Sequence, residues 1–157
     1  MAGDNQNMQT NAFLYLGAEN WAHPAWHRDF YPDGLPEDWM LSFYNTQFQM
    51  VFLPVAVWSK ASPDNWRQWL NDTQEGFVFV LEKGDDAEPP RDARVLAPSP
   101  AWLNAHVWWL DEAPDMRALA GRIAEHAANG EPLFVISRRG DLGLLRQAEA
   151  LRQVMGY

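Results

Sequence analysis

The hydrophobic positions of the chain fall into short apolar runs, separated by turn residues and by stretches with helical spacing. Apolar runs of roughly four to eight residues with such boundaries are typical of buried strands. We expect a strand in each of the five runs. They lie at residues 13–17 (FLYLG), 51–58 (VFLPVAVW), 77–81 (FVFVL), 106–110 (HVWWL) and 133–137 (LFVIS).

Helix signals lie between the runs. A proline followed by two acids at residues 36–38, and Ser-Pro-Asp at residues 62–64, each predict a helix start. The buried face of the first of these helices is expected to consist of Trp39, Met40, Phe43, Tyr44 and Phe48. Residues 114–129 have an amphipathic pattern, and Asp141 is placed to cap a last helix. Strands and helices therefore alternate, which predicts an α/β fold with a parallel sheet of about five strands and flanking helices.

The second run contains a proline at its centre. Pro54 has no N–H to donate to a neighbouring strand, and proline is usual only at sheet edges, bulges and strand ends. We expect that this strand lies at an edge, or that its pairing changes at Pro54.

The alternation breaks between the third and fourth runs. Residues 84–105 are rich in proline, and we interpret them as a connector within a single domain that spans residues 12–157. The polar opening, residues 1–11, predicts a disordered tail and no signal peptide.

Composition narrows the class of partner. The formal net charge is −9 and the pI is near 4.7, which argues against nucleic acid and against an anionic membrane surface. There is no cysteine, so disulfides and thiolate catalysis are excluded. No apolar run approaches the roughly eighteen residues of a membrane span, and we expect a cytoplasmic protein. Nine tryptophans indicate large pockets or contact surfaces.

Aromatic, glycine and proline positions in the N-terminal half follow two family motifs, G-x-S-G-W-x-x-x-x-W-x-x-x-F-Y-P and F-x-x-W-x-x-x-T-P-x-G-F-x-F-x-x-K. Over residues 13–83 the chain resembles the YecE-like family, known as domain of unknown function 72, and residues 73–77 depart from the second motif only at Gln74. Residues 106–130 and 133–155 resemble the family's last units more weakly. The positions that carry the resemblance are Gly17, Trp21, Trp26, Phe30-Tyr31-Pro32, Leu35-Pro36, Tyr44, Phe48, Trp66, Trp69, Gly76-Phe77, Phe79 and Lys83.

The resemblance implies an incomplete TIM-like β/α barrel. Such barrels usually take about 250 residues, and this chain has 157. We therefore expect the connector at residues 84–105 to replace the middle of the barrel. The five remaining strands would form an open parallel arc, with spatial order 3-2-1-5-4 when they are numbered along the chain.

The resemblance also implies a changed function at the carboxyl ends of the strands, where barrels hold their chemistry. The family reads V-E-I-N-S-T-F-Y at the second strand, whereas residues 51–58 carry no polar side chain and place Pro54 at the Asn. Residues 108–111 replace the family's Arg and His-Gly region, and Ser137-Arg138 replaces its Asn pair. We expect a YecE-like protein that is a non-catalytic binding or scaffold module. The alternative is an enzyme acting on a phosphorylated or sugar-like small molecule at these strand ends.

Charged residues after the strands are the candidates for that alternative. Glu19, Glu82 and Lys83 would be the catalytic residues, with Lys83 as a phosphate or carboxylate ligand, but the simpler interpretation is that they are solvated strand ends. Asp111 also follows a strand. Arg138, just before a helix, is placed either to bind an anion or to lie in a solvated turn.

Aromatic residues near the same strand ends either line a ligand pocket or belong to the core. The candidate ligand-binding residues are Trp21, His23, Trp26, Trp58, Lys83, Trp108 and Arg138.

No metal site and no cofactor are expected. His23 and His27 lie four apart on an irregular loop, where this spacing does not bring two ligands together. We interpret His106 as the start of a strand and His126 as a helix-surface residue.

The partner expected from these features is a second copy of the chain or another protein. An incomplete barrel would expose its inner face and leave the third and fourth strands as open edges, both of which favour association. A small-molecule ligand remains the other possibility.

Overall fold

A computed structural model describes residues 13–157, and the expected tail at residues 1–11 lies outside the described residues. Six parallel strands form one sheet with the order β4-β3-β2-β1-β6-β5. The strands are β1 (Leu14–Glu19), β2 (Met50–Leu53), β3 (Val78–Leu81), β4 (Val95–Leu96), β5 (Val107–Trp109) and β6 (Leu133–Ser137).

The predicted arc of five strands is confirmed, and the connector adds a sixth. Apart from β4, the observed order equals the expected 3-2-1-5-4. β4 comes from the proline-rich connector and pairs with β3 through Phe79 and Val80. The third strand is therefore covered, contrary to the expectation of an open edge, and β4 and β5 are the edges of the sheet.

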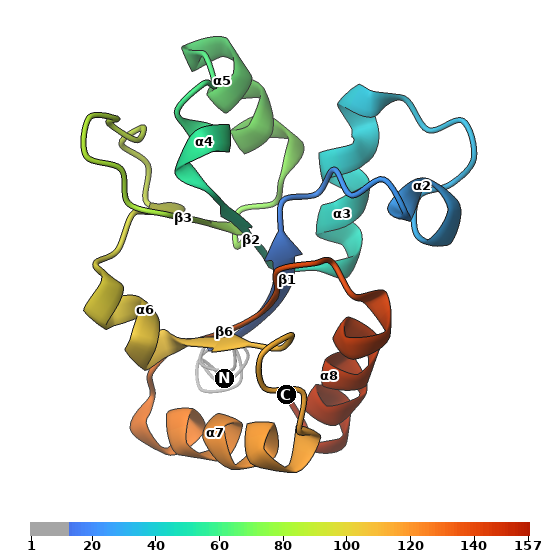
Figure 1. The fold of residues 1–157 in the computed structure, drawn as a ribbon, viewed down its shortest axis with the longest axis vertical. Helices are drawn as coiled ribbons and strands as arrows, with labels where there is room; N and C mark the ends of the chain where they lie inside the picture. Colours follow the sequence, from blue (N-terminus) through green and yellow to red (C-terminus); the bar gives the residue numbers. More distant parts are fainter. Residues whose placement is uncertain (1–12) are drawn as a thin grey trace, which may run out of the picture.

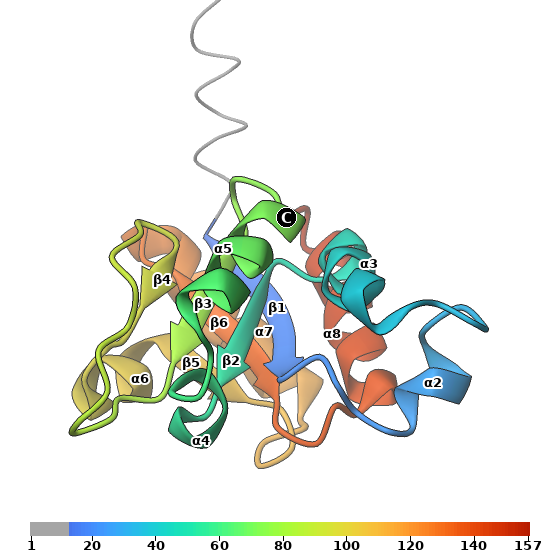
Figure 2. The ribbon, with the colours of Figure 1, turned by 90° about the horizontal axis from the view of Figure 1, so that it is seen from above.

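The sheet curls strongly, so that its inner face forms a core of its own (Figures 1 and 2). The rings of Phe52 on β2 and Trp109 on β5 lie 5.3 Å apart, although β1 and β6 separate these strands in the sheet. The buried residues of this inner cluster are Met50, Phe52, Val80, Val107, Phe134 and Ile136.

Helix α6 (Pro100–His106) closes the gap between the two edges of the arc (Figure 1). Its Trp102 and Leu103 pack against the inner cluster together with Leu96 of β4 and Trp109 of β5. The expectation of an exposed barrel face is wrong, because α6 and the curl of the sheet bury that face within one chain.

The remaining helices cover the outer face of the sheet (Figure 1). Their starts follow the predicted signals: Ser62 caps α5 in a reciprocal pair with Asn65, and the Asp141 side chain accepts from the backbone N–H of Leu144 in α8. The bounds are α2 (Trp26–Asp29), the 3-10 turn η1 (Glu37–Trp39), α3 (Met40–Gln47), α4 (Val55–Trp58), α5 (Pro63–Asp72), α7 (Met116–Asn129) and α8 (Leu142–Val154).

The apolar run at residues 51–58 is not one strand. β2 ends at Leu53, and Pro54, with φ −63° and ψ 153°, begins the short helix α4. The sequence predicted a longer strand that either lies at an edge or changes its pairing at Pro54. β2 is flanked by β1 and β3 and is not an edge strand, so only the expectation of a change at Pro54 fits. Proline is favourable there because a first helical turn needs no N–H from it.

Among the described residues, no helix is both long enough and apolar enough to cross a membrane.

Candidate functional site

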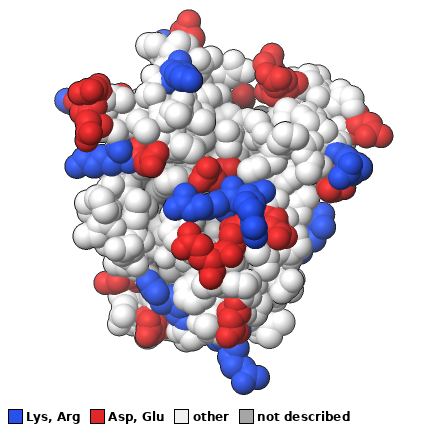
Figure 3. Space-filling view, in the orientation of Figure 1, with Lys and Arg blue, Asp and Glu red and all other residues white. Residues whose placement is uncertain are grey.

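The carboxyl ends of β1, β5 and β6 bring charged residues together at one end of the sheet, which we call the mouth. Its charged residues are Glu19, Asp111, Glu112, Arg138 and Arg139. Figure 3 shows the two signs side by side near the centre of this face. The mouth is where chemistry is usual in parallel α/β sheets, so its contacts decide whether a site is available.

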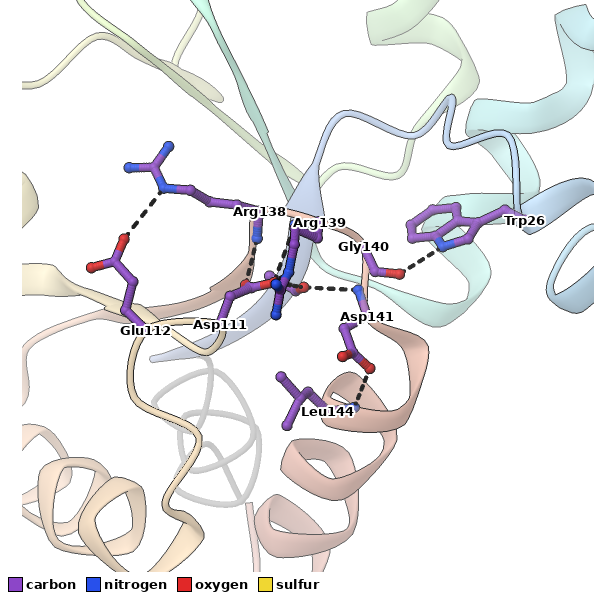
Figure 4. Close-up of polar contacts among 9 residues, drawn as sticks. Trp26, Asp111, Glu112, Arg138, Arg139, Gly140, Asp141 and Leu144 are labelled. Atoms are coloured by element: carbon purple, nitrogen blue, oxygen red, sulfur yellow. Dashed lines mark hydrogen bonds and ion pairs between the residues drawn. The ribbon is translucent and has the colours of Figure 1, made fainter.

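Asp111 is the polar centre of the mouth (Figure 4). Its carboxylate accepts hydrogen bonds from Ser137 Oγ at 3.0 Å and from the backbone N–H groups of Arg138 at 2.7 Å and Arg139 at 3.2 Å. The side chain is only 8% exposed. Burial alone would raise the pKa of Asp111, but the hydrogen bonds from Arg138, Arg139 and Ser137 outweigh it, and the pKa lies below the usual 3.8.

Asp111→Asn is expected to cost about 1–3 kcal/mol of unfolding free energy at neutral pH, because the amide turns an N–H toward groups that already donate. The lowered pKa of Asp111 means that the carboxylate stabilises the fold above about pH 4 and that this contribution is lost as the pH falls through the lowered value. Denaturant titrations should therefore show the gap between parent and variant narrowing in acid.

Glu112→Gln is the matched control, since Glu112 is 66% exposed and has one 3.6 Å ion pair with Arg138. Its effect should stay within about 0.5 kcal/mol. A gap between parent and Asp111→Asn that stays constant from neutral to acid pH would show that the charge of Asp111 does not stabilise the fold.

Arg138 lies across the mouth and is held on three sides. It pairs with Glu19 Oε1 at 3.1 Å and with Glu112 Oε2 at 3.6 Å. Its guanidinium lies 3.7 Å from the ring centroid of Trp109 and 5.9 Å from that of Phe52. Because Trp109 and Phe52 belong to the inner cluster or pack on it, Arg138 covers the end of that core with a charge that is already neutralised.

The polar groups of the turn after β6 are hydrogen-bonded to neighbouring residues of the protein. Ser137 Oγ accepts from the Asp141 backbone N–H at 2.9 Å, and Trp26 Nε1 donates to the Gly140 carbonyl at 2.9 Å (Figure 4). The nearest atoms of the His23 ring lie 2.8–2.9 Å from where a Cβ on Gly140 would be, and its Nε2 is 2.6 Å from the Glu19 carbonyl. These contacts favour the interpretation of this segment as a helix-capping turn over that of an anion site.

The three proposed catalytic residues do not form one group. Glu82 accepts from the Val55 backbone N–H at 2.8 Å and so caps α4, while Glu19 pairs with Arg138. Lys83 lines a separate, open depression of about 940 Å³ whose lining includes neither glutamate. Trp58 also lines it and donates from Nε1 to the Glu82 carbonyl at 2.9 Å.

The candidate tryptophans are dispersed and do not line one pocket. Trp26 and Trp58 are buried in the outer core. Trp108 donates to the Ala113 carbonyl at 2.9 Å, and Trp21 packs edge-on against Trp69 at 5.1 Å. The sequence left a ligand pocket and the core as the two interpretations of these residues, and most of them belong to the core.

Sequence reasoning missed a groove between η1, α3 and α5, which we call the acidic groove. Two adjoining depressions of about 390 and 650 Å³ share Asp38, Gln68 and Asp72 in their linings. Trp39, expected on a buried helix face, is 63% exposed at this groove. Within residues 13–157, none of the ion pairs involves Glu37, Asp38 or Asp72, in contrast to the mouth.

A cluster with metal-ligand chemistry lies at the amino ends of the strands, away from the mouth. It consists of His106, His126 and Glu131. His106 is the last residue of α6 and does not begin a strand, and His126 is buried in α7, with 6% exposed, and is not on the helix surface. Both expectations were wrong: α6 extends to His106, and the His126 ring lies against the His106 ring and the Pro132 carbonyl.

Comparison with known proteins identifies one family. The family described as protein of unknown function DUF72 matches residues 15–84, which run from β1 to just beyond β3 and confirm the resemblance to the YecE-like family. Neither the curated proteins nor the solved structures give a match.

Proposed function

We propose that this DUF72 relative is a non-catalytic module that binds a protein partner. The observation that carries the proposal is the mutual pairing at the mouth. There, Arg138 is neutralised by Glu19 and Glu112, and Asp111 accepts from three neighbouring residues. A general acid or base must be free to exchange a proton with a substrate, and these groups are engaged with one another.

The space beneath the mouth supports the same proposal. Phe52 and Ile136 are buried in the inner cluster at this end of the strands, and Arg138 lies over Phe52 and Trp109. A substrate could enter the barrel only by displacing this cluster, which would expose large apolar side chains to water at about 25 cal/mol per Å².

The rival function is an enzyme acting on a phosphorylated or sugar-like small molecule beside Lys83. The depression there is large enough for such a ligand, at about 940 Å³. However, its lining contains Asp85, Asp86 and Glu88 as well as Lys83, so three carboxylates accompany one ammonium group. This balance repels phosphate and leaves the rival with less support than the binding module.

The acidic groove supplies a surface for a basic segment of a partner protein. Glu37, Asp38 and Asp72 provide negative charge without an ion pair among the described residues, and Trp39 offers an exposed ring to a guanidinium group. Cation–π contact with tryptophan contributes about 0.5–2 kcal/mol, and arginine and tryptophan are both common at the centres of interfaces. A second copy of this acidic chain is a poorer occupant, because the net charge of −9 opposes self-association.

Fluorescently labelled deca-arginine is a suitable first probe, measured by anisotropy at about 0.15 M salt. Trp39→Ala and the double variant Asp38→Asn/Asp72→Asn should each weaken binding about tenfold, a loss of ~1.4 kcal/mol. The control is Asp85→Asn/Asp86→Asn, which removes the same charge from another surface and should change affinity much less.

Three results would contradict the proposal. Equal losses of affinity in both double variants would show that the peptide responds only to the net charge of the protein. A thermal-unfolding shift with inorganic phosphate or sugar phosphates that is abolished by Lys83→Ala would support the small-molecule enzyme instead. Light scattering that shows a concentration-dependent dimer would make a second copy the occupant in place of another protein.

A further inference from the structure

We infer that His106, His126 and Glu131 form a binding site for a divalent transition-metal ion of the Zn²⁺ class. One nitrogen of each imidazole and one carboxylate oxygen of Glu131 lie within 4.8 Å of one another. Two imidazoles and a carboxylate match the donors that Zn²⁺ takes in proteins, and they leave a fourth position for water.

The three ligands come from separate elements. His106 ends α6, His126 lies in the last turn of α7, and Glu131 follows α7 just before β6. His126 is buried, His106 is half-buried and Glu131 is exposed. The cluster therefore reaches from the protein interior to solvent, which gives an ion both a fixed ligand and a way in.

Both imidazole rings are oriented by one backbone group. The Pro132 carbonyl lies 2.9 Å from His106 Nδ1 and 3.0 Å from His126 Nδ1. A carbonyl only accepts, so both Nδ1 atoms carry protons, and in the neutral form of each ring Nε2 has a lone pair. A backbone carbonyl that holds a ring N–H is the usual outer support of a metal-binding histidine, because it fixes the ring and its tautomer.

Arg122 occupies one of the two lone pairs. Its Nε donates to His126 Nε2 at 3.1 Å. An ion at His126 Nε2 would displace this donor directly. An ion at Nδ1 would instead move the ring proton to Nε2, where it would face the Arg122 N–H. By either route, the metal ion and Arg122 compete for His126.

This competition would affect the packing of α6, because Arg122 also forms hydrogen bonds to the end of that helix. Its guanidinium donates to the carbonyls of Ala105 at 3.1 Å and Asn104 at 3.4 Å, at the end of that helix. A bound ion would replace this tie with a direct link from α6 to α7 through His106 and His126. Since α6 closes the gap in the sheet, metal binding should strengthen that closure.

The test is titration of the full chain with Zn²⁺ alone and with Co²⁺ alone, followed by calorimetry, by visible absorption of the cobalt form and by thermal unfolding. One saturable equivalent should bind and stabilise the fold. His106→Ala and Glu131→Gln should each weaken binding about tenfold or more. The matched controls His27→Ala and Glu125→Gln change exposed residues of the same types and should leave affinity unchanged.

Arg122→Met distinguishes this site from a surface histidine that binds metals weakly. It keeps the aliphatic stem but removes the competing donor, so Zn²⁺ should bind more tightly than to the parent chain. The inference is overturned if no saturable equivalent binds, if His106→Ala and Glu131→Gln both leave affinity unchanged, or if Arg122→Met does not tighten binding. Glu131→Gln keeps the test decisive if the half-buried His106→Ala is unstable.

Discussion

Gly17→Ala should destabilise the fold by ~3 kcal/mol or more, which is a large part of the roughly 5–15 kcal/mol that separates folded from unfolded domains. A Cβ added at Gly17 would lie 2.1 Å from the Met50 carbonyl oxygen, 2.7 Å from Met50 Sδ and 2.8 Å from Tyr44 Oη. The nearest of these atoms belongs to the backbone of β2, which cannot move without disturbing the centre of the sheet.

Chemical denaturation measures this loss directly, and the chain contains its own control. Gly121 lies in α7 with nothing within 4 Å of an added Cβ, so Gly121→Ala should stabilise the fold by about 0.5–1 kcal/mol through its helix propensity. A Gly17→Ala protein within about 1 kcal/mol of the parent would mean that β1 and β2 separate easily at this point.

The strands could be predicted because burial on both faces leaves a strong local pattern. β3, β5 and β6 fall within the expected runs, β1 overlaps its run and extends two residues beyond it, and the order of the strands followed from the family resemblance. β4 could not be found in this way, since it has only two residues. It is held from a distance: Arg94, the residue before it, donates to the Leu70 carbonyl at 2.7 Å at the end of α5.

The helix α4 was missed for the opposite reason. Every side chain from Val51 to Trp58 is apolar, so the run has no polar position from which a period of two or of 3.6 could be recognised. Only Pro54 marked the boundary between β2 and α4, and proline is compatible with a strand end as well as with a helix start.

The candidate site shows the same limit for polar residues. Leu119, Ile123 and His126 are the buried residues of α7, and their spacing of four and three is that of a helix face. That spacing was sufficient to place His126 on the buried face of α7. We expected it on the helix surface because histidine is a polar residue. Trp39 was misplaced because it belongs to a 3-10 turn, where the α-helical period does not hold.

The pairings at the mouth depend on contacts between distant parts of the chain. Glu19 and Arg138 are brought together because β1 and β6 are neighbours, and Asp111 reaches the same place from β5. Sequence reasoning placed all three at strand ends. It could not tell that they would neutralise one another, since that follows from the direction of each side chain.

The contact that the sequence concealed most completely lies between the two central strands. Tyr44 Oη accepts from the Ala18 backbone N–H at 2.7 Å and donates to the Met50 carbonyl at 2.7 Å. The hydroxyl therefore stands between β1 and β2 where a direct backbone hydrogen bond would be expected. Gly17 leaves room for it, which explains why these two positions depend on each other.

Burial raises the pKa of Tyr44 far above its usual range, so the hydroxyl is protonated at neutral and acid pH. Its two hydrogen bonds should accordingly show no titration of their own. This separates the effect of losing Tyr44 from the pH-dependent effect expected at Asp111.

Tyr44→Phe should cost about 2–6 kcal/mol, because it leaves the Ala18 N–H and the Met50 carbonyl buried without a partner, at about 1–3 kcal/mol each. Tyr31→Phe is the control, since that hydroxyl donates only to the Trp21 carbonyl and its loss should cost about 1 kcal/mol. Urea unfolding gives both values, and hydrogen exchange at the Ala18 amide reports the contact itself. That amide should exchange faster in Tyr44→Phe by more than the global loss of stability explains. Unchanged protection would mean that β1 and β2 close directly on each other once the hydroxyl is gone.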